Sequence, residues 1–147
     1  MESIGYLLAD NSRMARWAFD RHVRELGVTG PQARLLITLD RTPGQNQGFY
    51  AERLEVEPIT LCRMVDRLEE SGLIERRADP ADRRARLLFT TAKCRHFLEE
   101  LQQALDGLLD AMLDGLSTAE REQFQCLLER VGNNLSAHRE TLKASHG

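Results

Sequence analysis

The chain has 147 residues, of which 41% are hydrophobic and 5% aromatic, and its formal net charge is −3 at pH 7. This length is typical of a single domain, residues 1–147, and the composition favours a core of aliphatic side chains. No stretch reaches the roughly 20 apolar residues of a membrane span, and the first residues lack the basic start and apolar run of a signal peptide. We therefore expect a cytoplasmic protein with no membrane partner.

The sequence also lacks the patterns that enzymes and metalloproteins use. It contains no glycine-rich phosphate loop and no serine in a nucleophile turn, and its four histidines are scattered. The three cysteines, Cys62, Cys94 and Cys126, are too widely spaced for a metal motif and odd in number for a disulfide framework. We expect no catalytic activity, no metal and no cofactor, and we interpret the thiols as structural.

Charge is segregated along the chain. Residues 71–90 carry 5 arginines and 3 acidic side chains, whereas residues 91–147 carry 6 basic and 9 acidic ones. A local basic patch is compatible with a nucleic-acid partner even when the net charge is negative, because binding depends on where the charges lie.

The first predicted helix spans Ile4–Leu26. Its apolar face comprises Ile4, Leu8, Ala15, Phe19, His22 and Leu26. Trp17, the only tryptophan, lies on the opposite side, among Asp10, Arg13 and Arg21. A subunit contact or a bound ligand would explain an apolar side chain at this position, and simple surface exposure is the alternative.

Two shorter helices are expected next. Thr29 and Gln32 form a capping box that starts a second helix at about residues 30–40. A third helix follows at about residues 46–54. Glu57 then stands where a serine or threonine would cap the next helix better, so we expect a poorly capped start.

A fourth helix is predicted at Pro58–Ser71, followed by Gly72, which suits the left-handed position after a helix. At about 100° per residue, the helix has a core face and a presented face. The core face contains Leu61, Met64, Val65 and Leu68. The presented face contains Ile59, Thr60, Arg63, Asp66, Arg67 and Glu70.

A β-hairpin follows this helix. Residues 73–77 form the first predicted strand, Asp79-Pro80 supplies turn residues, and residues 86–90 form the returning strand. The hairpin tip carries Arg83, Arg84 and Arg86. Their positive charge extends beyond the domain, where a phosphate backbone or a narrow groove can receive it. The alternative is a solvated loop whose arginines pair with Asp79 and Asp82.

Two further helices complete the chain, one at about residues 91–116 and one that starts at a capping box on Ser117. Both carry leucine-rich stripes at helical spacing, and these stripes are too long for a small domain to bury alone. With the first helix, they predict a helical dimerisation region, residues 1–27 and 91–147, around a lobe at residues 30–90.

Several segments together resemble the MarR family of winged helix-turn-helix transcriptional regulators, and its SlyA-like members most. They are Val28-Thr29 with Gln32, Ala51-Glu52-Arg53-Leu54, Thr60 with Arg63, Val65-Asp66-Arg67-Leu68-Glu69, Gly72-Leu73-Ile74-Glu75-Arg76 and Asp79-Pro80-x-Asp82-Arg83-Arg84. The last two form a specific combination, because a generic helix-turn-helix does not need an acidic and basic hairpin tip. The resemblance covers most of the chain. It implies a mainly α fold with a winged helix-turn-helix lobe and terminal helices that form a dimer.

The resemblance further implies a homodimer that reads an inverted repeat in double-stranded DNA, with the presented helices in major grooves and the wings in flanking minor grooves. In the family's hairpin-tip pair the arginine, here Arg84, enters the minor groove and the aspartate, here Asp82, orients it. We expect Arg63 to read a base edge and Arg67 to hold phosphate. The full set of expected DNA contacts is Ile59, Thr60, Arg63, Arg67, Asp82, Arg83, Arg84 and Arg86.

By the same resemblance, the protein is expected to be a repressor that a small aromatic or anionic ligand releases from DNA. Arg13, Arg16 and Trp17 are the candidate ligand contacts. Two alternatives remain open. One is a redox-responsive regulator, for which Cys62 beside Arg63 on the presented helix is the thiol nearest to DNA. The other is a helical protein-interaction module that does not bind DNA.

Overall fold

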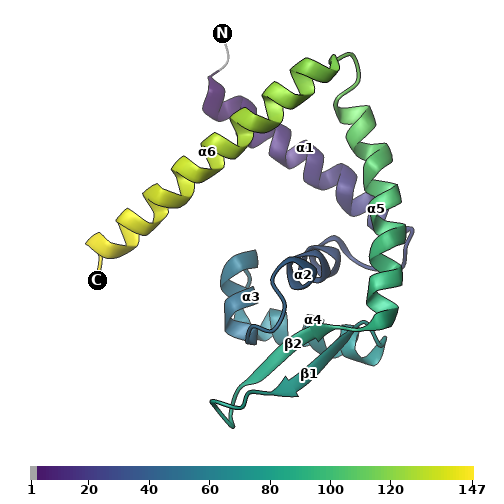
Figure 1. Ribbon diagram of the computed structural model, residues 1–147, viewed down its shortest axis with the longest axis vertical. Helices are drawn as coiled ribbons and strands as arrows, with labels where there is room; N and C mark the ends of the chain where they lie inside the picture. Colours follow the sequence, from purple (N-terminus) through teal and green to yellow (C-terminus); the bar gives the residue numbers. More distant parts are fainter. Residues whose placement is uncertain (1–2) are drawn as a thin grey trace. The chain divides into compact units, whose positions relative to one another are not determined.

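The computed structural model describes residues 3–147 (Figure 1). Within these residues the chain forms six helices and one antiparallel pair of strands. In chain order they are α1 Ile4–Arg24, α2 Gly30–Arg41, α3 Gln47–Leu54, α4 Pro58–Glu70, β1 Ile74–Ala78, β2 Arg86–Thr90, α5 Ala92–Met112 and α6 Thr118–Ser145. The predicted fold class, mainly α with a β-hairpin, is confirmed. No helix among the described residues has the length and apolar character needed to cross a membrane.

The chain divides into two compact units, Met1–Leu109 and Asp110–Gly147. The first unit contains α1 to β2 and most of α5, and the second contains the end of α5 and the whole of α6.

Side-chain caps fix the starts of two helices as predicted. At α2, Thr29 Oγ1 accepts the N–H of Gln32 at 3.2 Å, and Gln32 Oε1 accepts the N–H of Thr29 at 3.0 Å. Ser117 and Glu120 form the same reciprocal pair at α6, with distances of 3.2 and 2.8 Å. These hydrogen bonds favour the carboxylate and lower the pKa of Glu120. Glu57 makes no side-chain cap at α4, so the prediction of a poorly capped start is also confirmed.

The first unit encloses a single hydrophobic core. Its fully buried side chains include Val23, Leu35, Leu36, Leu39, Tyr50, Leu61, Val65, Leu88 and Cys94. The predicted apolar face of α1 is only partly an inner face, because its members Ile4, Leu8 and His22 are exposed. Val23, which the prediction left out, is buried. The buried line on α1 follows Phe19 and Val23, which are one turn apart, and His22 is about 100° away from it. The predicted dimerisation region therefore also contributes to this core, through Val23 and Cys94.

Two helices end earlier than predicted. α1 ends at Arg24 because Gly27, at φ 87°, reverses the chain. α5 ends at Met112, and Gly115, at φ 80°, lies in the turn that follows. Among the residues that the structure describes, no other helix or strand comes within 4 Å of a Cβ placed on Gly107, so this glycine marks no close contact within the single chain.

The β-hairpin is anchored to the body of the first unit by a third extended segment that the sequence did not predict. β1 and β2 pair in the register Ile74 with Thr90 and Ala78 with Arg86. The N–H of Gly44 donates to the carbonyl of Leu88 at 2.9 Å, and the N–H of Leu88 donates to the carbonyl of Gln45 at 3.0 Å. The loop between α2 and α3 thus runs beside β2 and holds the root of the hairpin in place.

The second unit has no comparable core. None of the residues of α6 is buried. Its apolar side chains, Phe124, Leu127, Leu128, Val131, Leu135 and Leu142, are between 42% and 58% exposed. The connection to α5 is held by Arg121, whose guanidinium donates to the carbonyls of Leu113 at 3.1 Å and Leu116 at 3.3 Å.

Candidate nucleic-acid interface

The two faces of α4 are separated as the sequence predicts. The four residues of the core face, Leu61, Met64, Val65 and Leu68, are all buried. The six residues of the presented face are all exposed, and Ile59 reaches 63%. Among the described residues, Arg63 and Arg67 form no salt bridge, so both guanidinium groups are available to an external acceptor. A helix with this division presents hydrogen-bond donors and an apolar contact on one surface.

The turn that leads into α4 is tight and strained. Glu55 has φ 54° and ψ 44°, and it is the one residue besides glycine with a positive φ among the described residues. Its N–H caps the end of α3 through the carbonyls of Ala51 and Glu52. The N–H of Val56 also donates to the carbonyl of Ala51, at 3.0 Å. Left-handed backbone at a residue with a Cβ persists only where surrounding contacts impose it, so this turn fixes the angle between α3 and α4.

The tip of the hairpin is organised by aspartates that bind backbone rather than arginine. Asp79 Oδ1 accepts the N–H of Ala81 at 2.9 Å, and Asp82 Oδ1 accepts the N–H of Arg84 at 2.9 Å. Of the three tip arginines, Arg83, Arg84 and Arg86, none forms a salt bridge within residues 3–147, and all are exposed. The structure therefore does not show the solvated loop of paired charges that was the alternative. The contact of Asp82 is with the backbone of Arg84, and it shapes the tip.

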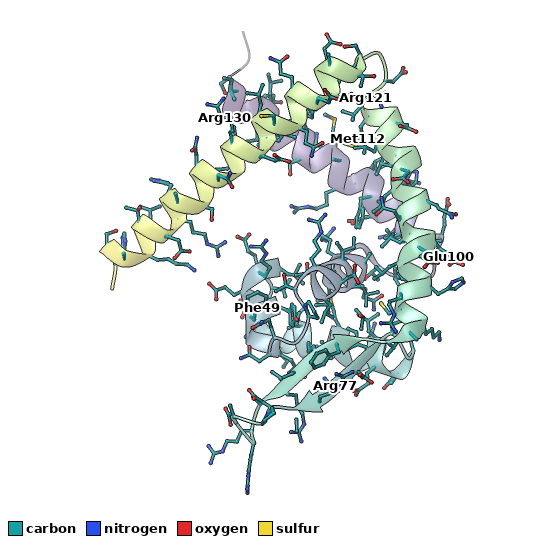
Figure 2. The ribbon with its side chains drawn as sticks, in the orientation of Figure 1. Phe49, Arg77, Glu100, Met112, Arg121 and Arg130 are labelled. Atoms are coloured by element: carbon teal, nitrogen blue, oxygen red, sulfur yellow. The ribbon has the colours of Figure 1, made fainter. Side chains whose placement is uncertain are left out.

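Two further arginines on β1 were not singled out from the sequence. Arg76 donates to Asp66 and Glu69 on α4. Arg77, labelled in Figure 2, pairs with Glu75. The Cζ of Arg77 lies 4.0 Å from the ring centroid of Phe89. Alternation along the strand separates the two arginines onto opposite faces. β1 shows no clear alternation of apolar and polar residues, because Arg76 occupies an inward-facing position. The sequence pattern therefore did not indicate that the two arginines lie on opposite faces of the strand.

The candidate ligand residues Arg13, Arg16 and Trp17 all lie on α1, and the contacts described for Arg13 and Trp17 are with other residues of the same helix. Trp17 is 61% exposed, and the Cζ of Arg21 lies 4.7 Å from its ring centroid. Arg13 pairs with Asp10 at 2.7 Å, and Arg16 is exposed. Trp17 is thus exposed in the single chain, as its position opposite the apolar face of α1 indicates, and the cation on its ring is Arg21 rather than Arg13 or Arg16.

The three cysteines occupy three different environments. Cys94 is fully buried, and burial, with a smaller contribution from the charge of Asp40, raises the pKa of its thiol from 9.0 to about 11. Cys62 on α4 is partly buried, and Cys126 on α6 is exposed. The most accessible thiol is therefore Cys126, on the helix that lies outside the DNA-contact candidates. The structural interpretation fits Cys94 and does not fit Cys126.

Comparisons with known proteins give a consistent result. The model of the MarR family matches residues 28–85, which include α2 to α4, β1 and the hairpin loop and end just before β2. The chain is similar to the protein in a crystal structure of MarR, with 28% identity over 94% of each chain and a TM-score of 0.84. It is 31% identical to the transcriptional regulator PA3341, over 92% of this chain and 99% of that one, with a TM-score of 0.76. It is 27% identical to the transcriptional repressor CouR, solved bound to a 23-mer DNA duplex, over 88% of this chain and 92% of that one, with a TM-score of 0.74.

Proposed function

This chain belongs to the MarR family of transcriptional regulators, and we propose that it is a homodimeric repressor that reads an inverted-repeat operator and is released by a small ligand. The family consists of DNA-binding regulators rather than enzymes, so the activity to be explained is control of transcription. CouR, a repressor similar along most of the chain, is known in a complex with a DNA duplex. That complex supports DNA as the partner of this protein.

The exposed face of α4 is the observation that carries the proposal. Arg63 lies in the first half of the helix, where recognition helices contact base edges, so we assign it to a base, most favourably guanine. Arg67 lies one turn further along, and we assign it to a phosphate. Ile59 offers an apolar contact to a thymine methyl group, and Thr60 offers a hydroxyl to a neighbouring base or phosphate.

The wing supplies the second set of contacts. We propose that Arg84 enters the minor groove beside the site of α4, because a groove narrowed by A·T base pairs concentrates negative potential. Asp82 holds the backbone N–H of Arg84 at 2.9 Å, and this contact sets the shape of the tip. Arg83 and Arg86 are assigned to phosphates on either side of the groove.

Uncovered apolar surface in both units supports the homodimer. In the first unit, α1 exposes Ile4 by 86% and Leu8 by 44%. In the second unit, α6 exposes its whole apolar face, and Leu135 reaches 58%. Apolar surface of this extent marks an interaction site. A symmetric dimer would place two copies of α4 about one helical turn of DNA, roughly 34 Å, apart, which is the geometry of an inverted repeat.

Release by a ligand follows from that spacing. A compound that binds the spread arrangement of the two lobes more tightly than the DNA-bound arrangement shifts the population away from DNA. Trp17 offers an exposed aromatic surface, and Arg13 and Arg16 offer positive charge on the same helix. We propose a small aromatic or anionic effector on this basis, acting without covalent bonds.

The test begins with footprinting on the DNA that flanks the protein's own gene, followed by binding measurements on the protected duplex at several salt concentrations. Arg63→Ala should cost about 1–3 kcal/mol per half-site and relax the preference at one base pair. Arg67→Ala should weaken binding to all sequences alike and should reduce the salt slope by about 1.

The matched control is Arg130→Ala, which removes one exposed arginine from the side of α6 away from Leu128 and Leu135, and it should leave both the base preference and the salt slope unchanged. Identical specificity profiles for Arg63→Ala and Arg67→Ala would show that the two assignments are wrong. Absence of any protected sequence, together with equal affinity for unrelated duplexes, would contradict the proposed operator binding itself.

A further inference from the structure

A single guanidinium group joins the wing to α4. Arg76, in the middle of β1, donates from Nη1 to Glu69 Oε1 at 2.8 Å and from Nη2 to Asp66 Oδ1 at 2.5 Å. Nη2 also donates to Gln47 Oε1, on the first turn of α3, at 3.2 Å. The backbone N–H of Arg76 donates to the second oxygen of Glu69 at 3.3 Å. We call Arg76, Asp66, Glu69 and Gln47 the Arg76 clamp.

The clamp is well suited to fixing geometry. The side chain of Arg76 is only 18% exposed. Burial alone would lower the pKa of Arg76, but hydrogen bonds and charge from Asp66 and Glu69 outweigh it and raise the pKa, so the group stays charged. A planar guanidinium holds three acceptors in fixed directions, which the single ammonium of lysine cannot reproduce. The strand therefore has one preferred position against the two helices.

The position of Asp66 connects this clamp to the DNA-contact surface. Asp66 lies on the presented face of α4, three residues after Arg63, and its side chain is 54% exposed. Glu69 follows on the side of the helix that faces β1, as its bonds to Arg76 require. The clamp thus attaches the wing at the edge of the surface that would enter the major groove.

We propose that Arg76 is a positioning residue that fixes the distance between the bases read by α4 and the flanking base pairs read by the wing. This inference rests on the proposed function, in which both elements contact DNA. Arg76 itself contacts no base in this scheme. It holds α4 and the wing in one fixed arrangement. The operator must therefore keep a fixed spacing between the inner sequence that α4 contacts and the A·T-rich flank that the wing contacts.

DNA geometry makes the spacing measurable. One inserted base pair moves the flank by about 3.4 Å along the axis and rotates it by roughly 34°. A rigidly held wing cannot follow this displacement and loses its minor-groove contact. A wing without the clamp remains attached through β2 and the segment at Gly44 and Gln45, but its tip is free to tilt.

The experiment uses half-sites selected from a random duplex pool by the parent protein, with and without one base pair inserted between the inner sequence and the flank. The parent should lose about tenfold in affinity on insertion, within the usual range for losing one specific contact. Arg76→Lys, which keeps the charge but cannot hold three acceptors, should lose less than about threefold. Arg77→Lys is the matched control, because Arg77 is adjacent on the same strand but outside the clamp, and it should behave like the parent.

A second variant removes the clamp from the helix side. Asp66→Asn combined with Glu69→Gln leaves Arg76 in place and should also lose less than about threefold on insertion. The measured quantity is the ratio of the affinities of one protein for the duplexes without and with the insertion. The altered net charge of this variant changes both affinities equally and does not change their ratio. A purely structural role would lower both affinities and leave the ratio at the value of the parent.

Three results would overturn the inference. The first is a loss of affinity on insertion in Arg76→Lys that equals the loss in the parent. The second is the same equality in the double variant Asp66→Asn with Glu69→Gln. The third is a variant that is folded but binds the duplex neither with nor without the inserted base pair. A different result would instead refute the proposed function, namely a parent protein whose affinity does not depend on the A·T flank even without the insertion. The two failures are therefore distinguishable within one set of measurements.

Discussion

The helices α4 and α6 are both amphipathic, but only one of them is covered by its own chain. α4 has 13 residues, and its four core-facing side chains are all buried in the first unit. α6 has 28 residues, and none is buried. Helical periodicity marks an apolar face in each case but does not say what covers it. The core of the first unit is therefore complete within one chain, whereas the apolar face of α6 is left for the proposed dimer partner to cover.

Disrupting the apolar face of α6 should have the largest effect. Leu128→Glu combined with Leu135→Glu places two carboxylates per chain on that face, and burying each one in a dimer costs several kcal/mol. We expect the dimer to dissociate and specific DNA binding to disappear, while the first unit stays folded. Sedimentation equilibrium at micromolar concentration and circular dichroism measure the two properties.

Asn133→Glu is the control for this pair, because Asn133 lies on the opposite side of the same helix, about 140° from Leu128. It should leave the dimer intact. A parent protein that sediments as a well-folded monomer would remove the basis of the comparison and of the inverted-repeat operator.

Removing core contacts from α4 should have the next largest effect. Leu61 is fully buried and Ile59, two residues earlier, is 63% exposed. We expect Leu61→Ala to lower the free energy of unfolding by about 2–5 kcal/mol, and Ile59→Ala to change it by less than about 0.5 kcal/mol. Chemical denaturation followed by circular dichroism measures both. Similar losses for the two variants would mean that the presented face is also covered.

The reactivity of the cysteines tests the difference between the buried core of the first unit and the exposed helix α6. Cys94 lies in the first-unit core and Cys126 on α6 is exposed. A thiol reagent at neutral pH should label Cys126 in the native protein and should reach Cys94 only after unfolding. Rapid labelling of Cys94 would show that the first unit opens readily. It would also revive the redox alternative, for which Cys126 and Cys62 are otherwise the accessible thiols.

The raised pKa of Cys94 also makes stability depend on pH. The folded protein keeps the proton, with a pKa of about 11, whereas the unfolded chain releases it near 9.0. The contribution of the protonated Cys94 thiol to the free energy of unfolding is therefore fully present below pH 9. As the pH rises towards 11, the free energy of unfolding falls by up to about 3 kcal/mol. The measurement is the difference in unfolding free energy between the parent and Cys94→Ala across this range. A difference that does not change with pH would contradict the burial of the thiol.

The smallest expected effect concerns the wing. Arg84→Ala should leave dimerisation and stability unchanged, because Arg84 is exposed at the hairpin tip. It should lower the preference for A·T-flanked over G·C-flanked operators by about 1 kcal/mol. Competition binding with the two duplexes measures the ratio. The same ratio in Arg84→Ala and in the parent would exclude minor-groove reading by this residue.

Local signals in the sequence were sufficient for most of the secondary structure. The capping boxes at Thr29 and Ser117, the glycine after α4 and the two faces of α4 were all predicted, and the structure confirms them. Each of these features depends on residues within one or two turns of each other. For the same reason, the resemblance carried by the segments around α4 and the hairpin was enough to identify the family.

Contacts between distant segments were decided by the tertiary structure alone. The burial of Val23 rather than His22 depends on where α1 meets α2, and periodicity allows either residue to face inward. Arg76 became visible as a clamp only when β1 lay against α4 and α3, because its acceptors are 7 to 29 residues away in the sequence. Sequence patterns describe which side of an element is apolar or charged, and only packing decides which partner that side meets.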